Sequence, residues 1–364
     1  MKMKRNYGVD FLRILSMFMV VVLHVLGNGG VLAAAEPNSL KYWMAWLLEI
    51  SCYCAVDCFA LISGYVMWRS SAKLSKALNL WLQTFFYTAL ALVLFLIFMP
   101  EAVGLRSIAN AIFPITRNHY WYISVYFGLM VLSPLLNTII VHAEKKVLGV
   151  VLLLAWALFS ALPHALMSDP YALSGGYSLI WLALLYLAGG FISKYSIADM
   201  IKKSWAWLTI TVMISLTFLS KFILRNFPQT ILPTQAFSDM FITYASPSIV
   251  LIGVAWLILC SKFSFGKRAT KCISILAPAS LGVYLVHVNQ LVWDNLFAGS
   301  FARFVEYNII VMILLILASA VVIYVACTVI ELIRIQLFKL LKIDKLCSAI
   351  ETRVTDLFQK YSKV

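Results

Sequence analysis

Three ionisable residues interrupt the first long apolar stretch of the chain, residues 8–26. They are Asp10, Arg13 and His24. In a helix with about 100° per residue, the eleven-residue step from Arg13 to His24 returns to nearly the same face, about 16 Å along the axis. Asp10 lies one turn before Arg13, so the three side chains form one polar line. A histidine exchanges protons near neutral pH, and an arginine holds an anion without titrating.

This polar line would be costly inside a membrane. Each ionisable group at that depth costs about 2.5 to 3.5 kcal/mol on insertion scales, so it usually faces a protein interior or a wet cavity and marks a function. A structural alternative exists, in which Asp10 and Arg13 pair to fix the helix end and His24 is a hydrogen-bonded core residue.

The composition of the whole chain indicates a membrane protein. Of its 364 residues, 63% are hydrophobic and 12% are charged, whereas soluble domains are about 45 to 50% apolar and about 25% charged. We predict an all-α polytopic bundle of about ten transmembrane helices over residues 1–330, followed by an amphipathic cytoplasmic tail over residues 331–364. The predicted spans are 8–28, 41–67, 77–99, 119–141, 147–165, 178–193, 204–223, 245–261, 272–292 and 308–330.

The net charge of +14 is distributed unevenly between the connections. Of the 29 Lys and Arg residues, 22 lie in alternate connections and the two tails, whereas only six lie in the opposite connections. This is the positive-inside pattern, which predicts a multi-pass protein of the cytoplasmic (inner) membrane with both termini cytoplasmic. The basic charge therefore serves orientation and contact with membrane lipids, and we expect no nucleic acid partner. The seven cysteines show no paired spacing in an outer loop, so we predict free thiols and no metal site.

Polar residues also gather at the inner end of the second span. Ser63 and Tyr65 form a polar seam, and Gly64 between them permits close helix approach. A basic helical face follows directly, made of Arg69, Lys73 and Lys76. Such a face usually meets anionic lipid, but it could also receive the phosphates of a nucleotide-bearing donor.

Two further polar groups lie in the later spans. His119, Trp121 and Tyr122 fall where the fourth span meets the outer interface, and a histidine is unusual within such an aromatic belt. Tyr284 and His287 recur with Ser280 at helical spacing in the ninth span. We expect His287 to hydrogen-bond within the bundle.

Four segments together resemble the acyltransferase-3 family, the membrane acyltransferases that O-acetylate surface polysaccharides and related envelope molecules. They are VDFLRILSMFMVVVLHV, ISGYVMW, HYWYISVYFGLMVLSPLL and SLGVYLVHVNQL, and they occur in this order. The resemblance implies a ten-helix bundle, acetyl-CoA as a cytoplasmic donor, and a carbohydrate-containing acceptor at the outer face. On matching positions, Arg13 and His24 are the family's paired residues of the first helix, and Arg69 is the basic position after the second span.

The resemblance assigns a chemistry to these residues. Acyl transfer to a hydroxyl requires deprotonation of a weak nucleophile and stabilisation of an oxyanion. We expect His24 to be the general base or to carry the acetyl group briefly, while Arg13, paired with Asp10, stabilises anionic charge on the donor. The predicted donor site comprises Ser63, Tyr65, Arg69, Lys73 and Lys76, and the predicted acceptor site comprises His119, Trp121, Tyr122 and His287.

Other functions fit parts of the same sequence. A proton-coupled transporter or flippase of an amphiphilic envelope precursor would use Asp10, Arg13 and His24 as a relay, although we find no repeated halves. A scaffold of an envelope-assembly complex would have no need of the buried charges. N-acylation, or a succinyl donor, would use the same residues. A homo-oligomer is also compatible with this sequence.

Overall fold

The computed structural model describes residues 5–71, 73–117, 119–226 and 238–361. These residues form helices and contain no β-strand, as predicted for an all-α bundle. The basic residues Lys2 and Lys4, which contribute to the predicted cytoplasmic N-terminus, lie outside the described residues.

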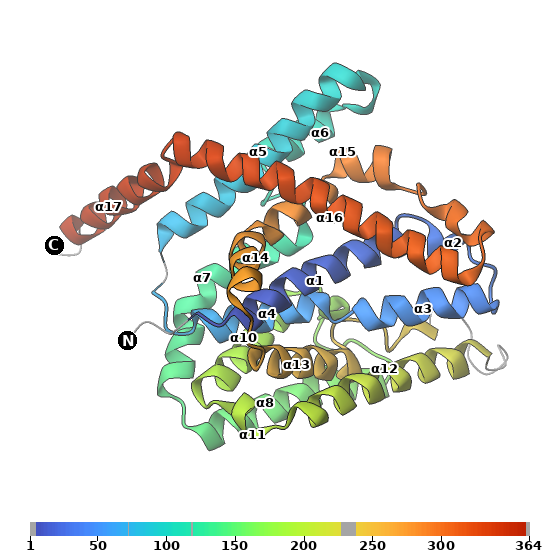
Figure 1. Cartoon of the computed structure of the whole chain (residues 1–364). Helices are drawn as coiled ribbons and strands as arrows, with labels where there is room; N and C mark the ends of the chain where they lie inside the picture. Colours follow the sequence, from blue (N-terminus) through green and yellow to red (C-terminus); the bar gives the residue numbers. More distant parts are fainter. Residues whose placement is uncertain (1–4, 72, 118, 227–237, 362–364) are drawn as a thin grey trace.

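Each of the ten predicted spans corresponds to a helix or a pair of consecutive helices (Figure 1). They are α1 (Tyr7–Leu26), α3 (Leu40–Cys52) with α4 (Ala55–Met67), α5 (Leu74–Phe98), α7 (Trp121–His142), α8 (Lys145–Trp156) with α9 (Leu162–Ala165), α10 (Leu179–Lys194), α12 (Lys203–Asn226), α13 (Pro247–Ser261), α14 (Lys267–His287) and α16 (Ile309–Leu340). Eight of these ten are long and apolar enough to cross a membrane, whereas α10 and α13 are shorter.

The connections between the spans contain short helices, which include α2 (Val31–Ala34), α6 (Leu105–Ile112), α11 (Ile197–Met200) and α15 (Gln290–Val292). A longer helix, α17 (Ile343–Tyr361), follows the last span. Among the described residues, single turns of 3₁₀- or π-helix include Pro100–Ala102, Ala157–Ala161, Ser174–Gly176, Trp293–Phe297 and Ala302–Glu306. The start of α1 and the end of α17 lie at one side of the bundle (Figure 1), which we call the terminal face.

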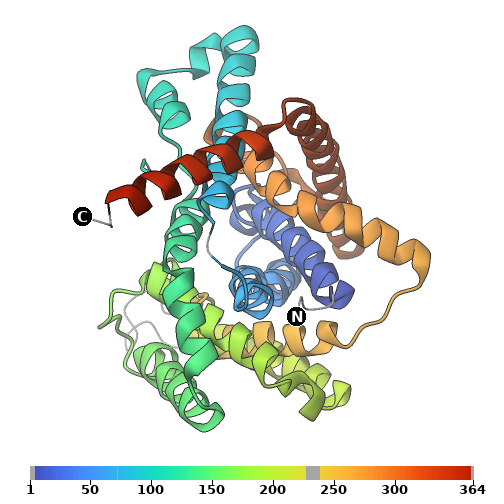
Figure 2. The same ribbon diagram turned by 90° about the vertical axis from the view of Figure 1, so that its left-hand side faces the viewer.

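Helix α1 occupies the interior of the bundle. It packs against α3, α4, α13, α14 and α16, and Figure 2 shows it with α3 and α4 inside a ring of the other long helices. Asn6 caps its start, because the side-chain oxygen accepts hydrogen bonds from the backbone N–H groups of Gly8 and Val9. The helix that carries the polar line is therefore held in the protein core and away from lipid.

Helices α4 and α10 approach each other so closely that only glycine fits between them. A Cβ added at Gly64 would lie 1.8 Å from the carbonyl oxygen of Tyr186, and one added at Gly189 would lie 2.0 Å from that of Leu61. This agrees with the prediction that Gly64 permits close helix approach.

Hydrogen bonds from α5 to a buried ion pair within α16 join these two helices. Glu331 accepts hydrogen bonds from Arg334 at 2.6 and 3.0 Å, and from the side chains of Gln83 and Tyr87. Because every partner is present, the desolvated carboxylate is compensated. Helix α16 continues to Leu340, past residue 330 where the predicted span ends. The following helix, α17, packs against α5.

Candidate active site

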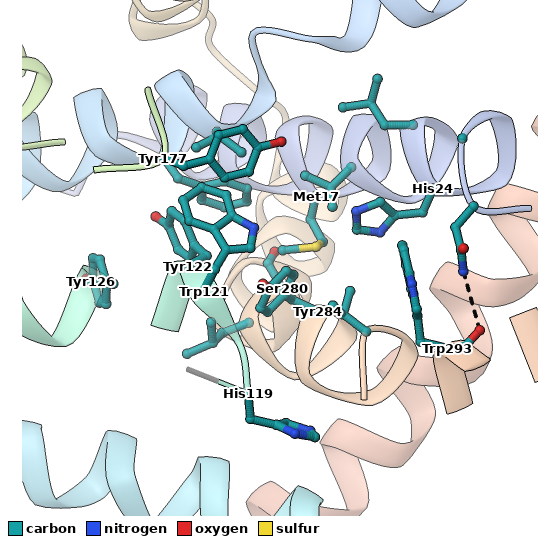
Figure 3. Close-up of a pocket in the computed structure, with 18 of the residues that line it drawn as sticks. Met17, His24, His119, Trp121, Tyr122, Tyr126, Tyr177, Ser280, Tyr284 and Trp293 are labelled. Carbon is teal, nitrogen blue, oxygen red and sulfur yellow. Dashed lines mark hydrogen bonds between the residues drawn. The ribbon is translucent and has the colours of Figure 1, made fainter. Parts of the chain in front are cut away.

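A cavity of about 1060 Å³ lies beside α1. Its wall combines residues of α1, α3, α4, α6, α7 and α14 with residues of the intervening connections. From α1 come Arg13, Met17, Val20, Leu23 and His24; the other polar and aromatic wall residues include Glu49, Tyr53, Ser63, Arg106, Asn110, Arg117, His119, Trp121, Tyr122, Tyr126, Tyr177, Tyr244, Ser280, Tyr284, Gln290, Trp293 and Asp294. Figure 3 shows His24 and Trp293 at one side of this cavity, Tyr177, Trp121 and Tyr122 at the other, and Met17 between them.

Arg13 and His24 line this same cavity. The eleven-residue spacing places them on one face of α1, and the packing of α14 and α4 around that face leaves the space open. Both side chains are half-buried. A cation and an imidazole are therefore accessible to one ligand.

His24 is hydrogen-bonded to a second histidine. Its Nδ1 lies 2.9 Å from Nε2 of His287, whose own Nδ1 lies 2.6 Å from the backbone carbonyl oxygen of Val283. A carbonyl oxygen can only accept, so Nδ1 of neutral His287 carries the proton and its Nε2 is an acceptor. His24 must then donate through Nδ1. This assigns its Nε2 as an unprotonated nitrogen, which is the form that a general base requires.

The ring of His24 is also held by packing. The indole of Trp293 lies perpendicular to it, with 4.7 Å between the ring centroids. His287 is 2% exposed and lies two helical turns from Ser280 on α14. It hydrogen-bonds within the bundle, as predicted, and it reaches the ligand space only through His24.

The carboxylate of Asp10 is shared between two arginines. Oδ2 lies 2.5 Å from Nε of Arg5, whereas Oδ1 lies 3.7 Å from a terminal nitrogen of Arg13. Within the described residues, Asp10 lies outside the cavity wall. Arg13 is therefore only loosely engaged by its predicted partner, and its guanidinium remains available to an anion.

The predicted acceptor residues His119, Trp121 and Tyr122 all line the cavity. His119 lies two residues before α7, and neither of its ring nitrogens hydrogen-bonds to a described residue. Burial lowers the pKa of His119 to about 4, because desolvation disfavours the imidazolium. The side chain is thus neutral at pH 7 and able both to donate and to accept a hydrogen bond.

The structure divides the predicted donor residues into two groups. Ser63 lines the large cavity, and Lys76 lines a second cavity of about 410 Å³ beneath α17. In contrast, Arg69 is exposed and stacks on Trp68 at 4.3 Å, while Lys73 is the exposed cap residue of α5. Among the described residues, Arg69, Lys73 and Tyr65 lie outside both cavity walls.

The two cavities share two wall residues, Tyr126 and Leu281. The hydroxyl of Tyr126 points to the sulfur of Met67 at 3.9 Å, and Met67 belongs to the wall of the smaller cavity. The two cavities therefore adjoin, with Tyr126 and Leu281 in the wall between them.

Several wall residues were not part of the predicted site. The sequence did contain an indication for Glu49, because a carboxylate in an apolar span is rare. Arg106 and Arg117 belong to the segment before α7, where Nε of Arg117 donates to Asn110 at 2.7 Å. Tyr177 and Tyr244 precede the two shortest spans, and no local pattern separates them from ordinary interfacial tyrosines.

These features define a multi-pass helical membrane protein with a cation, a histidine pair and aromatic residues around one internal cavity. The comparison with protein-family models matches residues 6–331 to an acyltransferase domain of the acyltransferase-3 family. The chain belongs to this family, which indicates a membrane acyltransferase. No curated protein and no solved structure was found to match the chain.

Proposed function

We propose that this protein is an O-acetyltransferase that moves an acetyl group from cytoplasmic acetyl-CoA to a hydroxyl of an envelope polysaccharide or lipid-linked sugar at the outer face. The observation that carries the proposal is the shared cavity, in which the free Nε2 of His24 and the guanidinium of Arg13 face one space. The protein would lie in the cytoplasmic membrane with both termini inside, since its Lys and Arg residues concentrate in the connections at the terminal face.

The donor would enter from the terminal face. Lys76 in the smaller cavity offers a charge for the phosphates of coenzyme A, and the thin pantetheine arm would pass Tyr126 and Leu281 toward Arg13 and His24. An extended arm is comparable in length with the roughly 16 Å that separates Arg13 from His24 along α1.

The reaction follows from the tautomer of His24. Nε2 takes the proton of the acceptor hydroxyl as its oxygen attacks the carbonyl carbon of the thioester. The carbon–sulfur bond then breaks, and the thiolate leaves with the proton held by the imidazolium. Arg13 stabilises anionic charge of the donor, because a guanidinium stays protonated throughout. His287 accepts from Nδ1 and keeps Nε2 directed into the cavity.

Removal of the proposed base provides the first test. We expect His24→Ala to reduce acetyl transfer by about 100-fold or more, measured as radiolabel moved from acetyl-CoA to envelope glycan by the purified protein in nanodiscs. His142→Ala is the matched control, since His142 is exposed at the end of α7. Equal activity of His24→Ala and wild type would refute the assignment, and liposome flux of an amphiphile without coenzyme A would favour a transporter.

A further inference from the structure

Four aromatic residues from four separate segments meet where helices begin. Tyr53 lies at the break between α3 and α4, and Trp121 is the first residue of α7. Tyr177 lies two residues before α10, and Tyr244 lies three residues before α13. The ring centroids are 4.4 Å apart for Trp121 and Tyr177, 4.9 Å for Tyr177 and Tyr244, and 5.0 Å for Tyr53 and Tyr244. All four line the large cavity, and we call them the aromatic chamber.

The short spans explain how the chamber comes to lie inside the bundle. Helices α10 and α13 have 16 and 15 residues, fewer than the roughly 20 that cross a bilayer. The connections before them must therefore extend into the membrane region, where irregular backbone is tolerated only if protein buries it or it lines a wet cavity. These two connections are joined by a hydrogen bond of 3.1 Å from Ala245 N to Gly175 O.

Glu49 adds a carboxylate to this wall. It lies one helical turn before Tyr53 on α3, is 8% exposed, and lines the large cavity. Its Oε2 is buried and accepts no hydrogen bond from a described residue. The nearby ammonium of Lys221 is paired with Asp239 and lies 3.3 Å over the ring of Trp46. A buried acceptor without a partner is uncommon in native proteins and calls for a ligand or water.

The aromatic rings and the carboxyl group of Glu49 together favour a sugar as the ligand. The aliphatic face of a pyranose packs on aromatic rings, and its hydroxyls can hydrogen-bond to the unpartnered carboxyl oxygen of Glu49. Tyr177 and Tyr244 also reach the chamber from connections opposite the terminal face, which is the side on which the acceptor is expected.

We propose that the aromatic chamber and Glu49 form the acceptor subsite, and that it takes a pyranose ring. This inference rests on the proposed function. In Figure 3, Tyr177 and Trp121 lie across the cavity from His24, with Met17 between them. A sugar that stacks on the chamber presents to Nε2 of His24 only the hydroxyls on its opposite edge. The chamber therefore determines which hydroxyl is acetylated.

The test measures the KM for the acceptor and the Kd for the donor separately. The acceptor probe is the oligosaccharide fraction released from envelope polysaccharide of cells that lack the protein, freed of esters by mild alkali. We expect Tyr177→Ala and Glu49→Gln to raise the KM for this probe by about tenfold or more, since each removes a contact to the sugar. The Kd for acetyl-CoA should stay within about twofold of wild type, because no donor contact is lost.

Two control variants match these changes. Tyr171 lies in the same connection as Tyr177 and is similarly exposed, at 39% against 45%, but belongs to neither cavity wall among the described residues. Glu36 is an exposed carboxylate in the connection before α3. Tyr171→Ala and Glu36→Gln should leave both constants unchanged.

The outcomes separate this inference from the proposed function. If Tyr177→Ala and Glu49→Gln acetylated normally with an unchanged KM for the acceptor, the subsite would be overturned. The same conclusion would follow if these variants bound acetyl-CoA more weakly while the KM for the acceptor stayed unchanged. Calorimetry with the same oligosaccharides provides a readout without catalysis. Sugar binding that is lost in Tyr177→Ala, in a protein that transfers no acetyl group, would support the subsite and refute the proposed function. Absence of sugar binding to wild type would overturn the subsite.

Discussion

At the scale of single residues, the histidine pair explains how a neutral imidazole is kept ready for proton transfer. The backbone carbonyl of Val283 fixes the proton of His287, which fixes the proton of His24 in turn. The logic resembles that of a nucleophile–base–orienter triad, in which loss of the correct tautomer is costly. In this protein the orienting group is itself a neutral histidine, and Trp293 restricts the remaining freedom of the His24 ring.

The orienting role of His287 predicts a graded series. His287→Ala removes the acceptor for Nδ1–H of His24, so we expect kcat to fall by about 100-fold through loss of the correct tautomer. His287→Gln offers an amide oxygen at the same end of the side chain and should recover part of this loss. The KM for acetyl-CoA should change little in both variants. Steady-state kinetics in nanodiscs checks this, and a glutamine variant as impaired as the alanine variant would contradict an orienting role.

At the scale of elements, close approach to helix α10 holds α4, which contributes Val56, Phe59 and Ser63 to the cavity wall. Gly64 and Gly189 place the backbone of each helix against carbonyl groups of the other. Small residues take this role in membrane bundles because apolar side chains gain little by leaving lipid, so packing contacts dominate the association of helices. Ser63 faces the cavity directly beside this contact.

A methyl group at Gly64 should therefore separate the two helices. A Cβ there would lie 1.8 Å from the oxygen and 2.6 Å from the carbon of the Tyr186 carbonyl, and such backbone atoms cannot rotate away. We expect Gly64→Ala to destabilise the fold by about 1 to 3 kcal/mol, seen as a lower Tm in detergent. Gly149→Ala is the control, because its nearest contact is a phenylalanine ring atom at 3.4 Å. Equal Tm values for the two variants would contradict this account.

At the scale of the whole molecule, two cavities adjoin, one beneath α17 and the other lined by His24. Tyr126 and Leu281 form their common wall. Helix α17 covers the smaller cavity through Asp344, Cys347 and Ser348, and is held to α5 by the hydrogen bond from Leu74 N to Glu351. The predicted contact of this tail with lipid stays a prediction, as does the oligomeric state.

The shared wall predicts a site at which added bulk blocks only the donor. Leu281→Trp should raise the KM for acetyl-CoA by about tenfold, because the pantetheine arm would pass beside this side chain. The KM for the acceptor should stay close to wild type. Ile275→Trp on the same helix is the control, since Ile275 is exposed on the outside of the bundle. If Leu281→Trp kept its Tm and a normal KM for acetyl-CoA, the path between the cavities would not be the donor route.

The sequence by itself determined the class, the spans and the central helix. Hydropathy and the distribution of Lys and Arg are local properties, so they identify ten spans without any knowledge of packing. The eleven-residue spacing likewise placed Arg13 and His24 on one face, since helical periodicity needs no tertiary contact. The membership of the acyltransferase-3 family likewise follows from the sequence, through the family model that matches residues 6–331.

Only the tertiary structure decided which distant residues share the site. The contact of His24 with His287 joins residues that are 263 positions apart, and the meeting of Tyr53, Trp121, Tyr177 and Tyr244 depends on where four segments end inside the bundle. The structure also shows that Arg5 and Asp10 pair with each other and that, among the described residues, both lie outside the cavity wall. Asp10 is nevertheless only one helical turn from Arg13, which lines that wall. These relations depend on how the helices pack against one another, and no periodicity within a single helix encodes that packing.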